Sequence, residues 1–215
     1  MGKSAGGSSK NYQTTGGKIT VVTIGITGGL GAGKSTACQR LKERGAIIFD
    51  ADAVAKETLQ EPQIQEQLID EFGAEIVRNG IVVASQLARI AFVNEENQST
   101  LNNIVHPCVI ERFEKLREDL GGRDGLLVMD APLIFESGID GHLDHTVLIY
   151  STMKLRIARA LRRGNLTREQ ILQRMALQMP EEEKRELADF VVENNGTIEH
   201  LYEEIDKLYT EIMGE

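Results

Sequence analysis

Five short apolar runs, rich in β-branched residues, recur along the chain, and stretches with helical patterns separate them. Each run is continuous rather than alternating, which is typical of parallel strands that are buried on both faces. Strands that alternate with helices indicate βαβ units. The pattern therefore predicts an α/β fold in which helices flank a doubly wound, parallel, five-stranded sheet. The five predicted strands are 21–27, 46–50, 126–130, 145–150 and 189–193.

A long insertion separates the second predicted strand from the third. About 75 residues lie between them, far more than one crossover helix requires. Ile64, Leu68 and Phe72 recur every fourth residue, as expected for one face of a helix. Pro107 precedes a further apolar pattern, which places it in the first turn of a helix. We therefore predict an inserted helical lobe over 58–120.

The segment 152–180 is basic, although the chain as a whole carries a formal net charge of −9. A capping-box pattern, Thr167 with Gln170, starts a new helix there after a turn at Gly164. Two interpretations are open: a solvated helix face, which is the usual role of charge runs, or a mobile lid that clamps phosphates. We favour the helical lid because the rest of the chain is acidic. The cations are Lys154, Arg156, Arg159, Arg162, Arg163, Arg168 and Arg174.

Composition narrows the class of protein. With 215 residues, 41% of them hydrophobic, the chain can bury a full core. Its acidic balance argues against a nucleic-acid partner, and no apolar run approaches the roughly 20 residues of a membrane helix. Cys38 and Cys108 form no CxxC pair, so we expect two free buried thiols in a reducing, cytoplasmic environment. A monomer is expected, with an oligomer left open.

The strongest motif lies where the first predicted strand meets its helix. It fits GxxxxGK[ST], and glycines at these positions let backbone N–H groups surround phosphate oxygens. The helix that follows adds its positive end. Lys34 can reach the β- and γ-phosphates, and the Ser35 hydroxyl can bind Mg²⁺ as a cofactor. The motif residues are Gly28, Gly29, Leu30, Gly31, Ala32, Gly33, Lys34 and Ser35.

This P-loop divides the chain into expected parts. Residues 19–57, 121–151 and 181–215 form the nucleotide-binding core, 58–120 the helical lobe and 152–180 the lid. Residues 1–18 are rich in Gly, Ser and Thr and lack an apolar stretch, so they are expected to be a flexible leader.

Three acidic residues end predicted strands beside this motif. Asp50 and Asp52 follow the second strand, where open α/β sheets bind ligands. A carboxylate there can accept the proton of an acceptor hydroxyl, but an acid there can equally cap the helix expected at 53–59. Asp130 ends the third strand, where a carboxylate helps to hold Mg²⁺, or is simply a solvated strand end. A fourth residue, His106, has no metal-type partners nearby in the sequence and stays ambiguous.

The motifs in this order resemble those of the dephospho-coenzyme A kinase family. The resemblance runs from Ile24 to Leu208 and does not extend to the leader. It rests on the combination of motifs, since each one alone is weak. The matching elements are TGGxGxGKST at 27–36, DAD at 50–52, Arg89 with Phe92, IVHP at 104–107, DxPLxFE at 130–136, RxxxQ at 174–178 and ADFVVENNG at 188–196.

The resemblance implies transfer of the γ-phosphate of ATP to the ribose 3′-hydroxyl of dephospho-coenzyme A, the last step of coenzyme A synthesis. It assigns the general base to Asp52 and acceptor binding to the helical lobe. Thr36 joins the ATP-binding loop, and Asn194 matches a position near the adenine of ATP. The lid arginines that match best are Arg159, Arg163 and Arg174, and the implied acceptor contacts also include Asp50, Arg89, His106 and Pro107.

Three positions depart from the family pattern. The lid turn reads Arg163-Gly164-Asn165 where the family commonly has Arg-Asp-Gly, which leaves any lid contact of that acid in doubt. Ala131 stands at a position where a branched residue is common. Lys56 replaces the usual arginine, and lysine lacks the planar bidentate contact of a guanidinium.

Two other classes of protein stay open. Another P-loop kinase would act on the hydroxyl of a nucleoside, a nucleotide or a shikimate-like acceptor. A regulatory GTPase is the second, since the sequence 119–122 fits DxxG by spelling, but no NKxD segment accompanies it. A screen of acceptors and the nucleotide preference would separate these classes.

Overall fold

The computed structural model describes residues 21–121 and 124–214, so the expected leader, 1–18, lies outside the described residues. Five parallel strands form one sheet in the order β2-β5-β1-β6-β7, which confirms the predicted fold. The central strand pairs with β5 on one side and with β6 on the other. The strands are β1 (Val21–Thr27), β2 (Ile47–Asp50), β5 (Gly125–Asp130), β6 (His145–Tyr150) and β7 (Phe190–Glu193).

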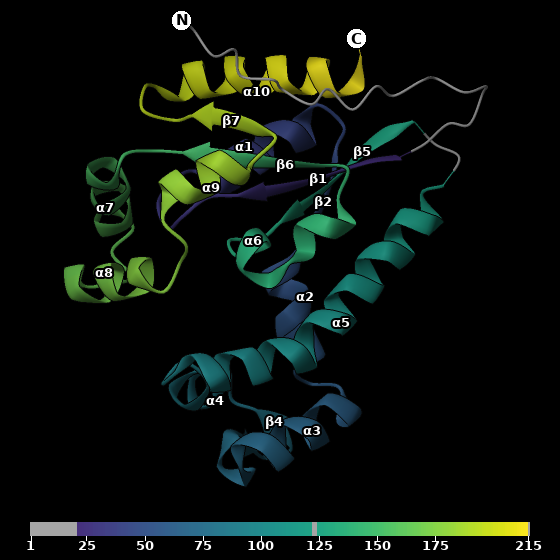
Figure 1. Cartoon of the computed structure of the whole chain (residues 1–215), viewed down its shortest axis with the longest axis vertical. Coiled ribbons are helices and arrows are strands. Elements are labelled where there is room, and N and C mark those ends of the chain that lie inside the picture. The colour runs from purple at the N-terminus through teal and green to yellow at the C-terminus, as the bar shows by residue number, and fades with distance from the viewer. Residues whose placement is uncertain (1–20, 122–123, 215) are drawn as a thin grey trace, which may run out of the picture.

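Helices cover both faces of this sheet, as Figure 1 shows. Alternate residues of β5 belong to different cores: Leu126 and Val128 pack with α1 and α10, whereas Leu127 and Met129 pack with the helices of the other face. Burial on both faces explains why the strand sequences are continuously apolar. The helices next to the sheet are α1 (Lys34–Glu43), α10 (Ile198–Met213), α2 (Ala51–Thr58), α6 (Ile134–Ser137), η2 (Ile139–His142) and α9 (Glu181–Leu187).

The inserted segment extends away from the sheet, at the bottom of Figure 1. It contains a small antiparallel hairpin that the helical pattern did not predict. The hairpin turns at Asn79 (φ 55°) and Gly80 (φ 76°), the Asn-Gly pair that favours a tight two-residue turn. The elements of this segment are α3 (Pro62–Phe72), η1 (Ala74–Ile76), β3 (Val77–Arg78), β4 (Ile81–Val82), α4 (Ala84–Ala91) and α5 (Glu95–Asp119).

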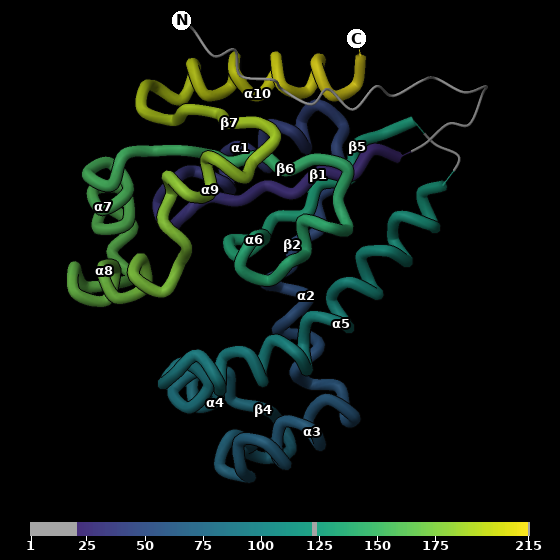
Figure 2. Tube along the Cα trace, viewed as in Figure 1, coloured from purple at the N-terminus to yellow at the C-terminus, as the bar shows by residue number. Residues whose placement is uncertain are grey.

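The expectation that Pro107 begins a helix is wrong. Pro107 lies inside α5, whose N-cap is Asn94. Proline cannot donate the backbone hydrogen bond of a helix interior and strains the preceding turn. Val105, Val109 and Phe113 are buried on both sides of it, so packing against the core outweighs that cost. Figure 2 shows that the path of α5 bends along its length.

The basic segment forms two helices, α7 (Met153–Arg162) and α8 (Arg168–Ala176), beside the sheet (Figure 1). The predicted capping box of Thr167 and Gln170 is present at the start of α8. A small core of Ala160, Ile171 and Met175 holds the two helices together. None of the helices in the described ranges is long and apolar enough to cross a membrane.

Candidate active site

The phosphate-binding loop of 28–35 connects β1 with the first turn of α1. Gly31 and Gly33 have φ angles of 82° and 107°, which other residues rarely adopt. A Cβ atom on Gly33 would collide with the amide of Asn194, and one on Gly31 with the backbone oxygen of Arg156. Both glycines are therefore required by the backbone conformation and by the segments packed against the loop.

A cavity of about 420 Å³ opens on one side of the loop. It brings together residues that the sequence analysis took from four separate segments: the P-loop, the DAD segment, the end of β5 and the basic segment. We call it the carboxylate cavity. Its lining residues are Leu30, Lys34, Ser35, Asp50, Asp52, Ala53, Lys56, Asp130, Pro132, Arg174 and Gln178.

The structure separates the two acids of the DAD segment. The Asp50 side chain accepts a 2.9 Å hydrogen bond from the backbone N–H of Ala53 and so caps α2. Asp52 lies in the first turn of α2, and no hydrogen bond occupies its carboxylate among the described residues. Of the two roles left open by the sequence, capping belongs to Asp50, and Asp52 is available to a ligand.

The ionisable groups of the carboxylate cavity influence one another. Burial raises the pKa of Asp52, and the negative charge of Asp50 raises it further, whereas Lys34 lowers it. Burial also raises the pKa of Asp130, again against the effect of Lys34. Desolvation lowers the pKa of Lys34, although both carboxylates favour its charged form. Asp52 is therefore a stronger base than an ordinary aspartate.

Two side chains with oxygen donors suited to a magnesium ion line this cavity. The Ser35 hydroxyl and the Asp130 carboxylate both line it. The described residues contain no cluster of three or more acidic, His or Cys side chains that would hold a metal alone. Mg²⁺ is usually bound by one or two protein oxygens together with phosphates and water, so this donor set fits it.

Cys38 and Asp130 influence each other's ionisation. Burial, and then the negative charge of Asp130, raise the pKa of the Cys38 thiol, so that the thiol stays protonated. Both cysteines are free, as expected, but Cys108 is only partly buried.

A second cavity, of about 410 Å³, lies on the other side of the loop. Three arginines line it and no acidic residue does, so we call it the arginine cavity. Arg159 donates hydrogen bonds to Ser151 Oγ (3.0 Å) and to Asn194 Oδ1 (3.2 Å). Burial, and then the charge of Arg162, lower the pKa of Arg159. The lining residues are Gly31, Gly33, Thr36, Arg159, Arg162, Arg163, Asn194, Gly196, Ile198 and Leu201.

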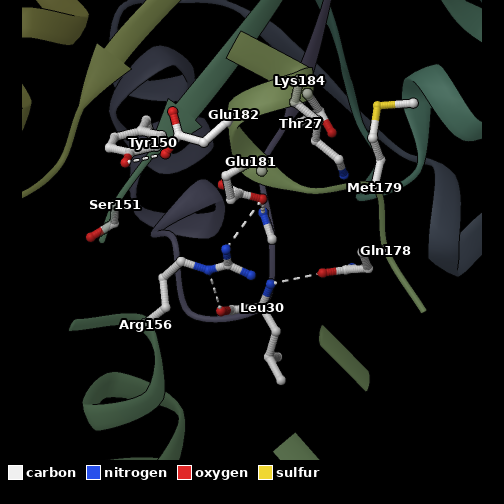
Figure 3. A network of polar contacts seen from close by, with 12 residues as sticks. Thr27, Leu30, Tyr150, Ser151, Arg156, Gln178, Met179, Glu181, Glu182 and Lys184 are labelled. Carbon is white, nitrogen blue, oxygen red and sulfur yellow. Dashed lines mark hydrogen bonds and ion pairs between the residues drawn. The ribbon is translucent and has the colours of Figure 1, made fainter. Parts of the chain in front are cut away.

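Side chains from α7, from the start of α9 and from the segment between α8 and α9 hold the start of the loop, as Figure 3 shows. Glu181 accepts a 2.9 Å hydrogen bond from the backbone N–H of Gly29. Arg156 forms an ion pair with Glu181 (3.4 Å) and donates to the backbone oxygen of Leu30 (3.2 Å). Both charged side chains are about 8% exposed, so each neutralises the other in a nearly dry setting. Gln178 accepts from the backbone N–H of Leu30.

A second buried ion pair lies beside the first. Lys184 is fully buried, and its Nζ lies 2.8 Å from Glu136 Oε1 and 2.9 Å from the backbone oxygen of Pro132. Glu136 also accepts a hydrogen bond from the backbone N–H of Met179 (2.9 Å). The connection between α8 and α9 is therefore fixed to the loop and to the segment that follows β5.

Three residues predicted to contact the acceptor lie outside the two cavities. Arg89 is exposed on α4, Pro107 is exposed on α5, and His106 is partly buried beside it. Burial lowers the pKa of His106, which favours its neutral form. In the described part of the chain, none of the three lines either cavity.

The sequence analysis did not identify the side chains that hold the phosphate-binding loop in place, which we call the loop anchors. Arg156 was grouped with the lid cations, yet it is buried under the loop, and charge patterning alone does not separate it from Arg159. Glu136 and Gln178 lie within motifs that carried the resemblance, which was the available signal. Glu181 and Lys184 stand in an exposed-looking acidic and basic run, and nothing local marks them as buried.

Comparisons with known proteins show which family and fold the chain resembles. A dephospho-CoA kinase from Fusobacterium nucleatum is 35% identical over 190 residues, which cover 88% of this chain and 97% of that protein. The crystal structure of TT1252 from Thermus thermophilus is 35% identical and superposes with a TM-score of 0.78, covering 89% of this chain and 98% of that chain. A shikimate kinase from Acinetobacter baumannii shares the fold, with a TM-score of 0.53 over 91% of this chain and 95% of that one, at 15% identity.

The fold alone therefore does not separate one acceptor from another, but the sequence match does. The model of the CoaE, dephospho-CoA kinase, family matches residues 22–200, which include most of the described chain and every lining residue of the two cavities except Leu201. The chain belongs to the dephospho-CoA kinase family.

Proposed function

We propose that this chain transfers the γ-phosphoryl group of ATP to the ribose 3′-hydroxyl of dephospho-coenzyme A, giving coenzyme A and ADP in the last step of coenzyme A synthesis. One observation carries the proposal beyond family membership. A carboxylate with no hydrogen-bond partner in the described chain, Asp52, lines the same cavity as the loop lysine, Lys34. A base and a phosphate-binding cation on one cavity are what transfer to a hydroxyl requires.

In the reaction, Asp52 accepts the proton of the 3′-hydroxyl. The acceptor oxygen forms a bond to the γ-phosphorus, the bond from that phosphorus to the β–γ bridging oxygen breaks, and ADP leaves with the electron pair. Lys34 and the loop N–H groups stabilise the negative charge on the phosphoryl oxygens. The raised pKa of Asp52 strengthens the base.

Ser35 and Asp130 would hold Mg²⁺ with the nucleotide, which would neutralise phosphate charge. Lys34 Nζ donates to the backbone oxygen of Gly28 at 2.8 Å, so it would exchange this contact for phosphate oxygens when ATP binds.

The arginine cavity would take the rest of ATP. Arg159 and Arg163 would contact the nucleotide phosphates, and Asn194 would lie near the adenine. Because Asn194 donates to the backbone oxygen of Ala32 at 2.8 Å and accepts from Arg159, it would act largely by fixing the loop and that arginine.

The inserted lobe, 58–120, would bind the body of the acceptor through Arg89, His106 and Pro107. These residues line neither cavity in this structure, so they would contact parts of the acceptor other than its 3′-hydroxyl. Closure of the lid, 152–180, would exclude water, a competing nucleophile. The enzyme is expected to work in the cytoplasm as a monomer.

The decisive experiment measures ADP release from ATP and Mg²⁺ with and without dephospho-coenzyme A, with the product identified by mass. Stimulated release and a product one phosphate heavier would support the proposal. Absence of stimulation in a folded preparation that binds ATP would overturn the acceptor, and a screen of shikimate-like and nucleotide acceptors would follow. A preference for GTP would instead revive the GTPase alternative, although Asp119 of its DxxG sequence is the last residue of α5 and lines neither cavity.

A further inference from the structure

Gln178 lies between the phosphate-binding loop and the carboxylate cavity. Its Oε1 atom accepts a hydrogen bond from the backbone N–H of Leu30 at 3.2 Å, and its side chain lines the cavity together with Lys34 and Asp52. Figure 3 shows the amide approaching the loop from the side opposite Arg156. The family resemblance contained this glutamine within a motif but gave it no role.

The hydrogen bond determines which way the amide faces. A backbone N–H group can only donate, so the amide must turn its oxygen toward Leu30. The Nε2 group, with two N–H donors, then points away from the loop. Neither donor has a hydrogen-bond partner in the described part of the chain, although the residue is only partly exposed.

The surroundings hold this amide in place. Gln178 follows the C-terminal end of α8, and Arg174, one turn earlier, lines the same cavity. The next residue, Met179, is fixed by its backbone hydrogen bond to Glu136. Leu30 packs against the small core of α7 and α8, which adds apolar contacts between the loop and these helices.

We propose that Gln178 donates a hydrogen bond from Nε2 to an oxygen of the γ-phosphoryl group of ATP while its Oε1 stays bound to Leu30. This inference rests on the proposed function, which places the γ-phosphate and the acceptor hydroxyl together in the carboxylate cavity. The side chain thereby tells ATP from ADP and orients the group to be transferred. One amide therefore connects the end of α8 with the phosphate.

Glu181, which also holds the loop, lacks the features that point to a phosphate contact. Glu181 also accepts from a loop N–H group, that of Gly29, but it is buried, is paired with Arg156 and does not line the cavity. Its role is confined to holding the loop. Gln178 combines the same kind of hydrogen bond with two N–H donors that have no partner in the described chain, and its side chain lines the cavity.

The test compares affinities for ATP and ADP, which do not depend on the acceptor. We would measure binding of a non-hydrolysable ATP analogue and of ADP, both with Mg²⁺, by calorimetry for the full chain and three variants. Gln178→Met removes tether and donors, Gln178→Glu keeps the acceptor for Leu30 and removes the donors, and Gln173→Met is a control on the exposed part of α8. Thermal unfolding of each variant verifies the fold.

The proposal expects both Gln178 variants to weaken binding of the ATP analogue by about tenfold relative to ADP, as loss of a hydrogen bond to a charged group predicts. The turnover of dephospho-coenzyme A should fall by a similar or larger factor. Gln173→Met should behave like the parent chain.

Three results would overturn it. An unchanged ratio of ATP to ADP affinity in both Gln178 variants would leave the residue as a tether only. Equal loss of both nucleotides in Gln178→Met, with Gln178→Glu unaffected, would mean the same. A weaker preference for the ATP analogue over ADP in Gln178→Glu alone would show that residue 178 lies near the phosphate but that Gln178 donates no hydrogen bond to it. If the parent chain fails to phosphorylate dephospho-coenzyme A, the proposed function fails, but the affinity ratios still decide the role of Gln178.

Discussion

The two cavities share one loop but differ in charge. The carboxylate cavity contains three acids together with Lys34, Lys56 and Arg174, whereas the arginine cavity contains three arginines and no acid. Gly31, Gly33 and Thr36 face the arginine cavity, and Leu30, Lys34 and Ser35 face the other. The loop thus divides the site into a part with mixed charge and a part with positive charge only.

In the proposed function, this difference assigns proton transfer to one cavity and phosphate binding to the other. Only the carboxylate cavity contains groups that can accept a proton, and burial and mutual repulsion raise the pKa values of Asp52 and Asp130 there. The arginine cavity can neutralise phosphates but has no group able to act as a base at neutral pH, because its only ionisable lining residues are arginines, which stay protonated in proteins. Substitutions on the two sides should therefore affect different kinetic constants.

The largest effect is expected on the carboxylate side. Asp52→Asn removes the base, and kcat should fall by roughly 10²–10⁴-fold. Binding of ATP should change by no more than about twofold, because the contacts of the loop with the nucleotide are preserved. Steady-state kinetics and calorimetry measure the two quantities. Turnover close to that of the parent chain would show that Asp52 is not the general base.

The matched control for this substitution is Asp50→Asn. Asparagine caps a helix as well as aspartate does, so α2 should remain intact and the loss of kcat should be much smaller. Equal losses in the two variants would mean that a negative charge, and not a proton acceptor at Asp52, is what the cavity requires.

The sequence predicted the sheet and the loop because both depend on local patterns. A strand covered on two faces must be apolar throughout, and a loop that surrounds phosphates must have glycines at fixed positions. The prediction for Pro107 was wrong because local preference favoured a helix start, whereas packing of Val105, Val109 and Phe113 decided the outcome. The Asn79–Gly80 turn was a readable hairpin signal that the helical pattern obscured.

Local sequence patterns could not predict the loop anchors. Arg156 and Arg159 lie three residues apart on α7, yet one is buried under the loop and the other lines the arginine cavity. Their partners, Glu181 and Asn194, come from later segments that only the folded chain brings near. A contact that depends on two distant segments has no signature within either of them.

A smaller effect is expected on the arginine side. Arg163→Gln should raise the KM for ATP by about tenfold, because a charged contact with phosphate is lost, and should lower kcat less. Arg168→Gln is the control, since Arg168 is equally exposed at the start of α8 but lines neither cavity. A change in kcat larger than the change in KM would assign Arg163 to the transition state and weaken the contrast between the cavities.

The smallest effect concerns the pH dependence of the carboxylate cavity. Asp52 must be ionised to accept a proton, so kcat/KM should fall on the acid side as Asp52 becomes protonated. The charge of Asp50 raises the pKa of Asp52, and Asp50→Asn removes that charge. The pKa of Asp52 should therefore fall, and the acid limb of kcat/KM should move to lower pH. A limb that moves to higher pH, or does not move, would show that another group controls it. In Arg163→Gln the limb should keep its position, because Arg163 is not among the groups that shift Asp52.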